Sequence, residues 1–142
     1  MKAVDTNVLV YAHRTDTPFH DKAASTLRGL AEGQSQWAIP WPCVSEFYSV
    51  VTHPRIYDPP SSRDEALGQL RAWVESPTCI LLAEPPGHWE QFERLIRDAK
   101  VAGPVVHDAR IAAICAAQGI SELITQDRDF SRFPDLRCTG LI

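Results

Sequence analysis

Four carboxylates lie at positions where folding alone does not readily account for an acid: Asp5, Glu46, Asp108 and Asp127. Asp5 and Asp127 directly follow short apolar runs typical of strands, whereas Glu46 and Asp108 lie in helix-like segments among apolar neighbours. If the fold gathers these carboxylates, they repel one another and bind protons unless a cation neutralises them. The pattern therefore predicts a divalent-metal site and metal-assisted chemistry on a phosphate.

The acids that follow strand-like runs also have structural explanations. Asp5 is a candidate for a turn or for the cap of a helix beginning near Val8, although Asn7 is the more natural cap and would leave Asp5 free. Asp127 and Asp129 share one turn, and one of the pair is expected to cap the short helix that follows. The sequence leaves open which of these two aspartates faces a metal.

The acids on helix-like segments have different alternatives. Glu46 lies in a helix that is apolar around most of its circumference, so its carboxylate is expected to be half-buried, either in an ion pair with an arginine or at a metal. Asp108 could be the N-cap of its helix and not a metal ligand. However, Pro104 at the first helical position would place Asp108 a full turn inside the helix. There Asp108 shares a face with Ile111 and Cys115, and the helix dipole favours its ionised form by roughly 0.3–1 kcal/mol.

The metal is predicted from the types of ligand available. The five histidines show no HxxxH or HxH spacing and the four cysteines no CxxC pair, so zinc is not expected. Carboxylate oxygens favour Mg²⁺, with Mn²⁺ as a substitute. Thr6 and Thr125 either orient a carboxylate or a water with their hydroxyls, or are ordinary threonines at strand ends. The number of ions stays open, and the chain contains no GxSxG nucleophile motif or Gly-rich phosphate loop.

Short apolar segments alternate with helix-like segments along the whole chain. Strands are expected at residues 2–4, 37–39, 79–82 and 123–125, with a last one near 138–142. Helices are expected over residues 8–14, about 21–32, 42–52, 62–75, 88–99 and 104–118. This order predicts an α/β fold with a parallel sheet covered on both faces. Ligands of such sheets collect beyond the carboxyl ends of the strands, where Asp5 and Asp127 are both expected to lie.

Size and composition are those of a single globular domain spanning residues 1–142. The hydrophobic fraction of 44% and the charged fraction of 23% are ordinary for such a domain, and no apolar run approaches the ~20 residues that span a membrane. An acid at position 5 argues against a secretion signal, so a cytoplasmic location with reduced, buried cysteines is expected. The formal net charge of -4 weakly opposes nucleic-acid binding but does not describe local patches. The four tryptophans are expected in the core, with Trp41 the one candidate for a surface stacking residue.

Four motifs in this order match a known family. They are Asp5-Thr6-Asn7, Ser45-Glu46-Phe47, Val106-His107-Asp108-Ala109-Arg110-Ile111-Ala112-Ala113 and Thr125-Gln126-Asp127-Arg128-Asp129-Phe130. Each motif alone is weak, but the four together cover essentially the whole chain and resemble a PIN domain. Residues 52–56, Thr-His-Pro-Arg-Ile, and the spacing throughout resemble more narrowly the actinobacterial VapC-type toxins of toxin–antitoxin pairs. Pro104 is one departure, because relatives are expected often to carry Asn there; it touches none of the acids.

The resemblance implies a three-layer α/β/α PIN-like domain with a central mostly parallel sheet. It implies a Mg²⁺-dependent endoribonuclease that cleaves structured cellular RNA, forms a homodimer and is neutralised by a VapB-type antitoxin. By motif, metal binding transfers to Asp5 and Asp108. Glu46 and Asp127 would complete the acidic site, with Asp129 a less certain member.

The residues also suggest a mechanism as a hypothesis. Asp5 and Asp108 hold a Mg²⁺ ion that positions the scissile phosphate and an attacking water. Glu46 and Asp127 hold that water or a second ion. Single-stranded loops of structured RNA are the expected targets, because their bases can be splayed open. Candidate phosphate contacts, each more simply explained as a solvated surface residue, are Arg14, Arg55, Arg110 and Arg128.

Two other functions fit parts of the pattern. An acid after the first strand also occurs in phosphatases that form an aspartyl-phosphate, here at Asp5. Those enzymes need a second aspartate two residues on, where this chain has Asn7, and no obvious partner lysine follows. The second alternative is a non-catalytic PIN-like binding module in an antitoxin complex, against which the complete set of acids argues.

Overall fold

A five-stranded sheet forms the centre of the protein in a computed structural model that describes residues 1–141. The strands are β1 (Lys2–Val4), β2 (Trp37–Pro40), β3 (Cys79–Leu82), β4 (Glu122–Ile124) and β5 (Cys138–Thr139). Their order across the sheet is β3-β2-β1-β4-β5, and every neighbouring pair is parallel. The register pairs Val4 with Ile124, so Asp5 and Thr125 leave the sheet from adjacent strands at the same edge.

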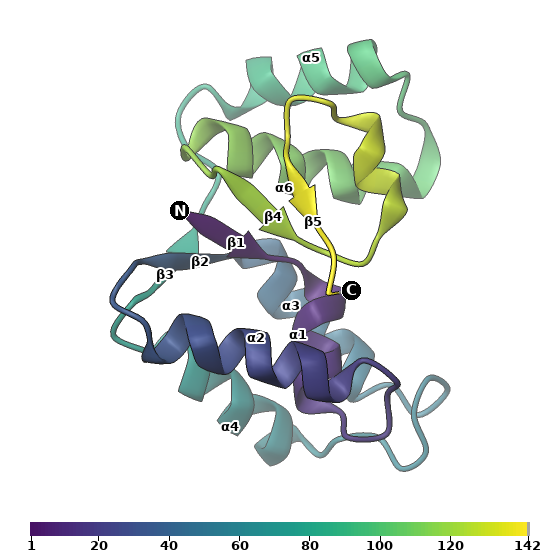
Figure 1. The fold of residues 1–142 in the computed structure, drawn as a ribbon. Coiled ribbons are helices and arrows are strands. Elements are labelled where there is room, and N and C mark those ends of the chain that lie inside the picture. Colours follow the sequence, from purple (N-terminus) through teal and green to yellow (C-terminus); the bar gives the residue numbers. More distant parts are fainter. Residues whose placement is uncertain (142) are drawn as a thin grey trace.

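Helices cover both faces of this sheet. They are α1 (Thr6–His13), α2 (His20–Glu32), α3 (Trp41–Val51), α4 (Arg63–Val74), α5 (His88–Ala99) and α6 (Val106–Ala117), with 3-10 helices η1 (Gly103–Val105) and η2 (Arg128–Arg132). Figure 1 shows α1 to α4 gathered on one side of the sheet and α5 and α6 on the other. The predicted three-layer α/β/α architecture with a parallel sheet is therefore confirmed. Among the described residues, no helix combines the length and hydrophobicity needed to cross a membrane.

Apolar packing fixes the two strands that carry the site. Ala3 and Val4 on β1 and Leu123 on β4 have no exposed surface, and Ile124 has almost none. Large side chains from both helical layers fill the space around them, among them Phe47 on α3. Each square ångström of apolar surface removed from water contributes roughly 25 cal/mol. The carboxyl ends of β1 and β4 are consequently anchored in the hydrophobic core.

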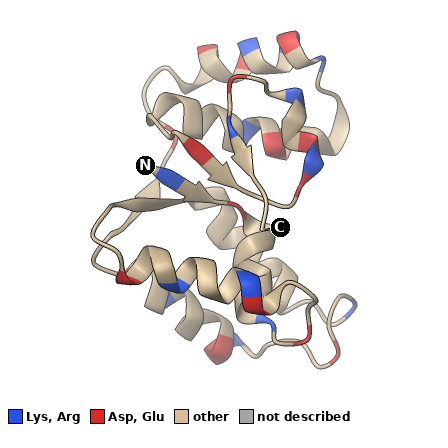
Figure 2. Cartoon of the chain, viewed as in Figure 1, with Lys and Arg blue, Asp and Glu red and all other residues tan. Residues whose placement is uncertain are grey.

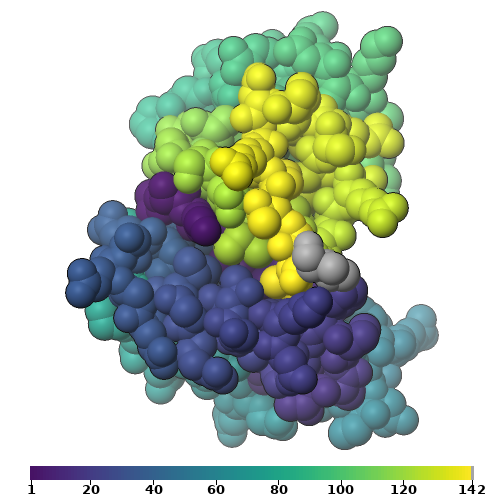
Figure 3. Space-filling model, viewed as in Figure 1, coloured from purple at the N-terminus to yellow at the C-terminus, as the bar shows by residue number. Residues whose placement is uncertain are grey.

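The surface carries mixed charge, and the C-terminal segment closes one side of the fold. Figure 2 shows acidic and basic residues interspersed along the outer helices, with no large basic face in this view. Figure 3 shows the yellow C-terminal segment crossing between the green part of the chain and the blue N-terminal helices. The backbone N–H of Leu141 donates to the side-chain oxygen of Gln126 at 2.6 Å, which ties this segment to the turn after β4.

Two expectations about buried residues were wrong. Trp89 is 63% exposed in the first turn of α5, a helix that packs chiefly on α6. Trp41 is 49% exposed at the start of α3, as the surface alternative for this residue allowed. The cysteines are all free, but Cys138 is exposed on the edge strand β5 rather than buried.

Helix boundaries differ in two places that bear on the site. Helix α1 begins at Thr6 with Asp5 as its cap, so the expectation that Asn7 caps it was wrong. Pro104 lies in η1, and α6 begins only at Val106; Asp108 is therefore in the first turn of α6 and not a full turn inside. The last strand is shorter than expected, Cys138–Thr139, and residue 142 lies outside the described residues.

Candidate active site

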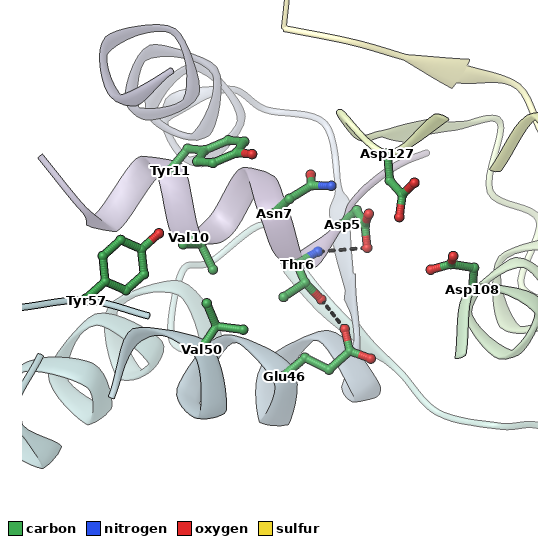
Figure 4. Close-up of a pocket in the computed structure, with 10 residues that line it drawn as sticks. All are labelled: Asp5, Thr6, Asn7, Val10, Tyr11, Glu46, Val50, Tyr57, Asp108 and Asp127. Carbon is green, nitrogen blue, oxygen red and sulfur yellow. Dashed lines mark hydrogen bonds between the residues drawn. The ribbon is translucent and has the colours of Figure 1, made fainter. Parts of the chain in front are cut away.

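A single pocket at the carboxyl edge of the sheet brings the four predicted acids together. The pocket has a volume of about 280 Å³. Its lining comes from α1, α3, α6 and the segments after β1, α3 and β4: Asp5, Thr6, Asn7, Val10, Tyr11, Glu46, Val50, Tyr57, Asp108 and Asp127. Figure 4 shows the four carboxylates at one end of this pocket and the tyrosines at the other. The predicted spatial convergence of residues far apart in the sequence is confirmed.

Asp5 is the most deeply placed acid, with 4% of its surface exposed. Its Oδ1 accepts the backbone N–H of Thr6 at 2.8 Å, and its Oδ2 accepts the hydroxyl of Thr125 at 2.7 Å. The pKa of Asp5 is raised to about 6, mainly by burial and to a smaller extent by the charges of Glu46 and Asp127, although both hydrogen bonds lower it. Asp5 thus caps α1 and lines the pocket at once, so the two explanations offered by the sequence do not exclude each other.

Thr125 connects three parts of the site through one hydroxyl. Besides donating to Asp5, its Oγ1 accepts the backbone N–H of Asp127 at 3.0 Å and lies 3.4 Å from the donating amide nitrogen of Asn7. The side-chain oxygen of Asn7 accepts the backbone N–H of Gln126 at 3.2 Å. These bonds clamp the start of α1 to the turn after β4. Sequence analysis treated Asn7 as a cap and missed this role, for which the sequence contains no local signal.

Glu46 reaches the pocket from the middle of α3 and is half-buried. Its Oε2 accepts the hydroxyl of Thr6 at 2.8 Å, shown as a dashed line in Figure 4. Within residues 1–141 it forms no ion pair, so the alternative of a structural Glu46–arginine pair is wrong. Thr6 and Thr125 therefore orient one carboxylate each, as the first of the two sequence interpretations expected.

Asp108, Asp127 and Asp129 form a tight group of acids on the α6 side. One carboxylate oxygen from each lies within 4.8 Å of the other two. Burial, and after it the charges of Asp127, Asp5, Asp129 and Glu46, raise the pKa of Asp108 to about 7. A bound cation would offset both the burial of Asp108 and the repulsion from these neighbouring carboxylates.

Asp127 and Asp129 have different surroundings. Asp127 lines the pocket and caps η2, accepting the backbone N–H of Asp129 at 2.8 Å. Asp129 is exposed and does not line the pocket, although it belongs to the three-acid group. The structure therefore turns Asp127 toward Asp5 and leaves Asp129 at the outer rim.

The donor atoms fit a hard divalent cation. The acidic end offers carboxylate oxygens, with threonine hydroxyls behind two of them. The thiol of Cys43 donates to Oδ1 of Asp5 at 3.8 Å, and burial keeps the pKa of this thiol well above the usual range. A thiol held protonated is a poor metal ligand. The carboxylate oxygens are therefore the ligands that this pocket offers to a divalent cation.

The four arginines considered as phosphate contacts fall into two groups. Arg14 pairs with Asp16, and Arg110 pairs with Glu84, so neither is available without breaking an ion pair. Arg55 and Arg128 are exposed and pair with no acid among residues 1–141. Of the four, these two are the better candidates for a contact with a polyanion.

Comparison with known sequences identifies the class of fold and site. The PIN domain family model matches residues 2–136, and the chain therefore belongs to the PIN domain family. It is 34% identical over 137 residues to Ribonuclease VapC43 of Mycobacterium tuberculosis, covering 96% of this chain and 92% of that protein. It is 30% identical over 133 residues to Ribonuclease VapC48 of the same species, covering 94% and 92%.

Solved structures share the fold at lower identity. A VapBC2 complex from Rickettsia felis, bound to a DNA fragment from its promoter, has a TM-score of 0.71 at 19% identity and covers 98% of this chain and 97% of the matched one. Mycobacterium tuberculosis VapC20, described as a toxin that cleaves the sarcin–ricin loop, has a TM-score of 0.66 at 16% identity and covers 92% and 93%. These likenesses extend over nearly all of the chain, as the sequence resemblance implied.

Proposed function

We propose that this protein is a metal-dependent endoribonuclease and the toxin of a type II toxin–antitoxin pair. The observation that carries the proposal is the meeting of Asp5, Glu46, Asp108 and Asp127 in one pocket of a PIN fold. The relatives at 30–34% identity are named ribonucleases, and they match over more than nine-tenths of this chain. The partners that follow from this assignment are a VapB-type antitoxin and RNA. The proposed location is the cytoplasm, where both partners occur.

Asp5 and Asp108 are the proposed ligands of Mg²⁺, with Mn²⁺ as a substitute. Asp127 and Asp129 add oxygens beside Asp108, which supports a site held from both sides of the pocket. The bound ion would polarise a phosphoryl oxygen and supply a hydroxide-like water near neutral pH. Because Thr125 donates to the ionised form of Asp5, it helps to keep that carboxylate ready for a cation.

Glu46 is the proposed proton acceptor. Its Oε2 accepts the hydroxyl of Thr6, which leaves its Oε1 as the second acceptor atom of this carboxylate. The threonine therefore orients the carboxylate and leaves one oxygen to take a proton from a water. Asp127 faces the same space and would hold that water or a second ion.

A homodimer is proposed on the basis of an apolar patch, the α3–α4 patch. It consists of Trp41, Val44 and Tyr48 on α3 and Leu67 on α4. Trp41 and Leu67 are 49% and 50% exposed, which is a large apolar area for an isolated monomer. A second copy of the chain would remove this area from water.

The deciding experiment compares the wild type with Asp108→Asn on single-stranded and loop-containing RNA in the presence of Mg²⁺. Cleavage by the wild type, its loss on chelation of the metal, and its loss in Asp108→Asn are the expected results. Expression of the wild type should also arrest growth of a bacterial host, and Asp108→Asn should not. An inactive wild type that nevertheless binds its antitoxin would support the non-catalytic module instead.

The phosphatase alternative is disfavoured by the position two residues after Asp5. Asn7 stands there, and its amide is used in bonds to Thr125 and Gln126. No lysine lines the pocket. Incubation with a phosphomonoester and detection of a phosphorylated Asp5 would revive this alternative.

A further inference from the structure

The pocket of the acids has a second end that no acid lines. Val10 and Tyr11 on α1, Val50 on α3 and Tyr57 in the loop after α3 form this aromatic end. Figure 4 shows the two tyrosine rings on the side of the pocket opposite Asp108, with the two valines between them and the acids. A ligand that fills the pocket therefore meets anionic oxygens at one end and flat apolar surface at the other.

The ring of Tyr57 is held in place by a chain of contacts. The guanidinium of Arg14 lies over the ring, 4.2 Å from its centroid. Arg14 is itself fixed, because its Nε donates to Asp16 at 2.9 Å and its Nη1 to the hydroxyl of Ser61 at 3.3 Å. One face of the Tyr57 ring is thus covered by a cation, and the ring is left to contact a ligand with its other face or its edge.

The loop that carries Tyr57 is anchored at its far end. Ser61 is 5% exposed; its backbone N–H donates to the carbonyl of Val51 at 2.8 Å, and its hydroxyl lies 2.9 Å from Nε2 of His13. On the opposite wall, the Tyr11 ring packs on Phe19 with centroids 5.2 Å apart. Both aromatic walls are therefore in position before any ligand arrives, which lowers the entropic cost of binding.

We propose that the aromatic end of the pocket is a subsite for one unstacked base of the RNA, next to the phosphate that is cleaved. This inference rests on the proposed ribonuclease function and names what the same pocket recognises. A nucleotide is the ligand that joins a phosphate, for the metal at the acids, to a flat apolar ring within one pocket. Tyr57 and Tyr11 supply the ring surfaces, and Val10 and Val50 supply the apolar floor.

A subsite of this kind selects unpaired RNA without selecting one sequence. Every base has a face that can stack on an aromatic side chain, so stacking tolerates sequence changes. A base inside a duplex presents only its edges and cannot enter between the tyrosines without unpairing. This end of the pocket consequently selects a base that can leave its RNA duplex.

The test is a cycle that combines protein variants with altered RNA. The probe is a short single-stranded RNA that the wild type cuts, together with copies in which each nucleotide flanking the cut is made abasic in turn. In the wild type, one flanking abasic position should lower kcat/KM about tenfold to a hundredfold. Tyr57→Ala should lower kcat/KM on intact RNA by a similar factor and should be insensitive to the same abasic change.

Matched controls separate stacking from damage to the loop. Tyr57→Phe keeps the ring and should keep the abasic penalty, whereas Tyr57→Leu keeps apolar bulk and should lose it, which covers the case in which Tyr57→Ala fails to fold. Ile56→Ala changes the neighbouring residue, which is 52% exposed and outside the pocket, and should behave as wild type.

Each outcome supports or overturns the subsite. An abasic penalty of wild-type size in both Tyr57→Ala and Tyr57→Leu overturns it. Unchanged RNA cleavage with lost neutralisation by the antitoxin in these variants also overturns it, and shows that a protein side chain occupies the aromatic end. A wild type that cuts no RNA in Mg²⁺ refutes the proposed function itself, which is a different result from a wild type that cuts but shows no penalty.

Discussion

The hydroxyl of Thr125 donates a 2.7 Å hydrogen bond to Oδ2 of Asp5, across 120 positions of sequence. The bond joins the carboxyl ends of β1 and β4, which are neighbouring parallel strands. It favours the ionised form of a carboxylate whose pKa burial raises to about 6. Ionisation of the most deeply buried acid in the pocket therefore depends partly on a residue from the other end of the chain.

Thr125→Val should shift the pH dependence of catalysis upward. Removal of the donor raises the pKa of Asp5 further, so cleavage at pH 6 should fall about tenfold, a loss typical of one hydrogen bond to a charged group, and fall less at pH 8. The measurement is a pH–rate profile. Thr26→Val, on α2, removes a hydroxyl that donates to the carbonyl of Lys22 outside the pocket and should leave the profile in place. A uniform loss at all pH values would mean that Thr125 acts through packing alone.

Metal-free protein should become less stable as the pH rises from about 4 to 7. The pKa of Asp5 is raised to about 6 and that of Asp108 to about 7, from an ordinary value of 3.8, so the folded state binds more protons than the unfolded state in this range. Stability then falls with increasing pH. Thermal unfolding in a chelator should show a falling Tm, and Asp5→Asn should flatten the curve.

Added Mg²⁺ should reverse that trend, because the ion binds the ionised acids and so stabilises the folded state by mass action. The gain in Tm should be largest near pH 8 and should vanish near pH 5. A metal-free Tm that rises between pH 4 and 7 would contradict the raised pKa values.

Asp127→Asn should weaken metal binding more than Asp129→Asn does. Asp127 lines the pocket, whereas Asp129 is exposed at its rim. Asparagine can still cap η2, so the comparison isolates the charge. Calorimetric titration with Mn²⁺ should show about a tenfold loss for Asp127→Asn, a size known for groups that support a metal site. Equal losses in the two variants would place both aspartates at the metal.

Glu46→Gln should lower kcat with little effect on metal affinity. Glutamine can still accept the hydroxyl of Thr6 but cannot take a proton from water. The expected loss in kcat is about 10²–10⁴-fold, the range for general base catalysis. Single-turnover cleavage and a Mn²⁺ titration measure the two effects separately. A variant with weak metal binding and normal kcat at saturating metal would make Glu46 a ligand instead of a base.

Leu67→Glu should convert the proposed dimer into a monomer. Leu67 is 50% exposed in the α3–α4 patch, so a charge there should change the stability of the single chain by no more than about 0.5 kcal/mol. Light scattering coupled to size-exclusion chromatography gives the mass directly. Ala72→Glu is the matched control, because Ala72 is exposed on the same helix but points about 140° away from Leu67.

Much of the fold is predictable because its strands are short apolar runs between clear helix signals. The four acids are recognisable for a related reason: a carboxylate among apolar neighbours, such as Glu46, needs an explanation that burial alone does not give. Parallel pairing then brings the residues after β1 and β4 together, and this geometry follows from the order of elements.

Other features depend on tertiary contacts that no local pattern encodes. Tyr57 lies in a loop without periodicity, and its place in the pocket follows from Arg14 and Ser61, which are distant or unremarkable in the sequence. The spacing of Trp89 places it in the apolar stripe of its helix, yet the residue is exposed in the first turn of α5. The two roles of Asp5, helix cap and pocket residue, were treated as alternatives. The sequence does not reveal that one side chain can have both roles at once.

The clamp between Asn7 and the turn after β4 has a consequence for biosynthesis. The side-chain oxygen of Asn7 accepts the backbone N–H of Gln126, which lies 119 positions later in the chain. Asp108, another residue of the pocket, is also far from the N-terminus. A ribosome therefore completes most of the polypeptide before the acids can meet. A nascent chain therefore lacks the assembled acidic pocket, and the proposed nuclease activity can begin only after almost the whole protein has been made.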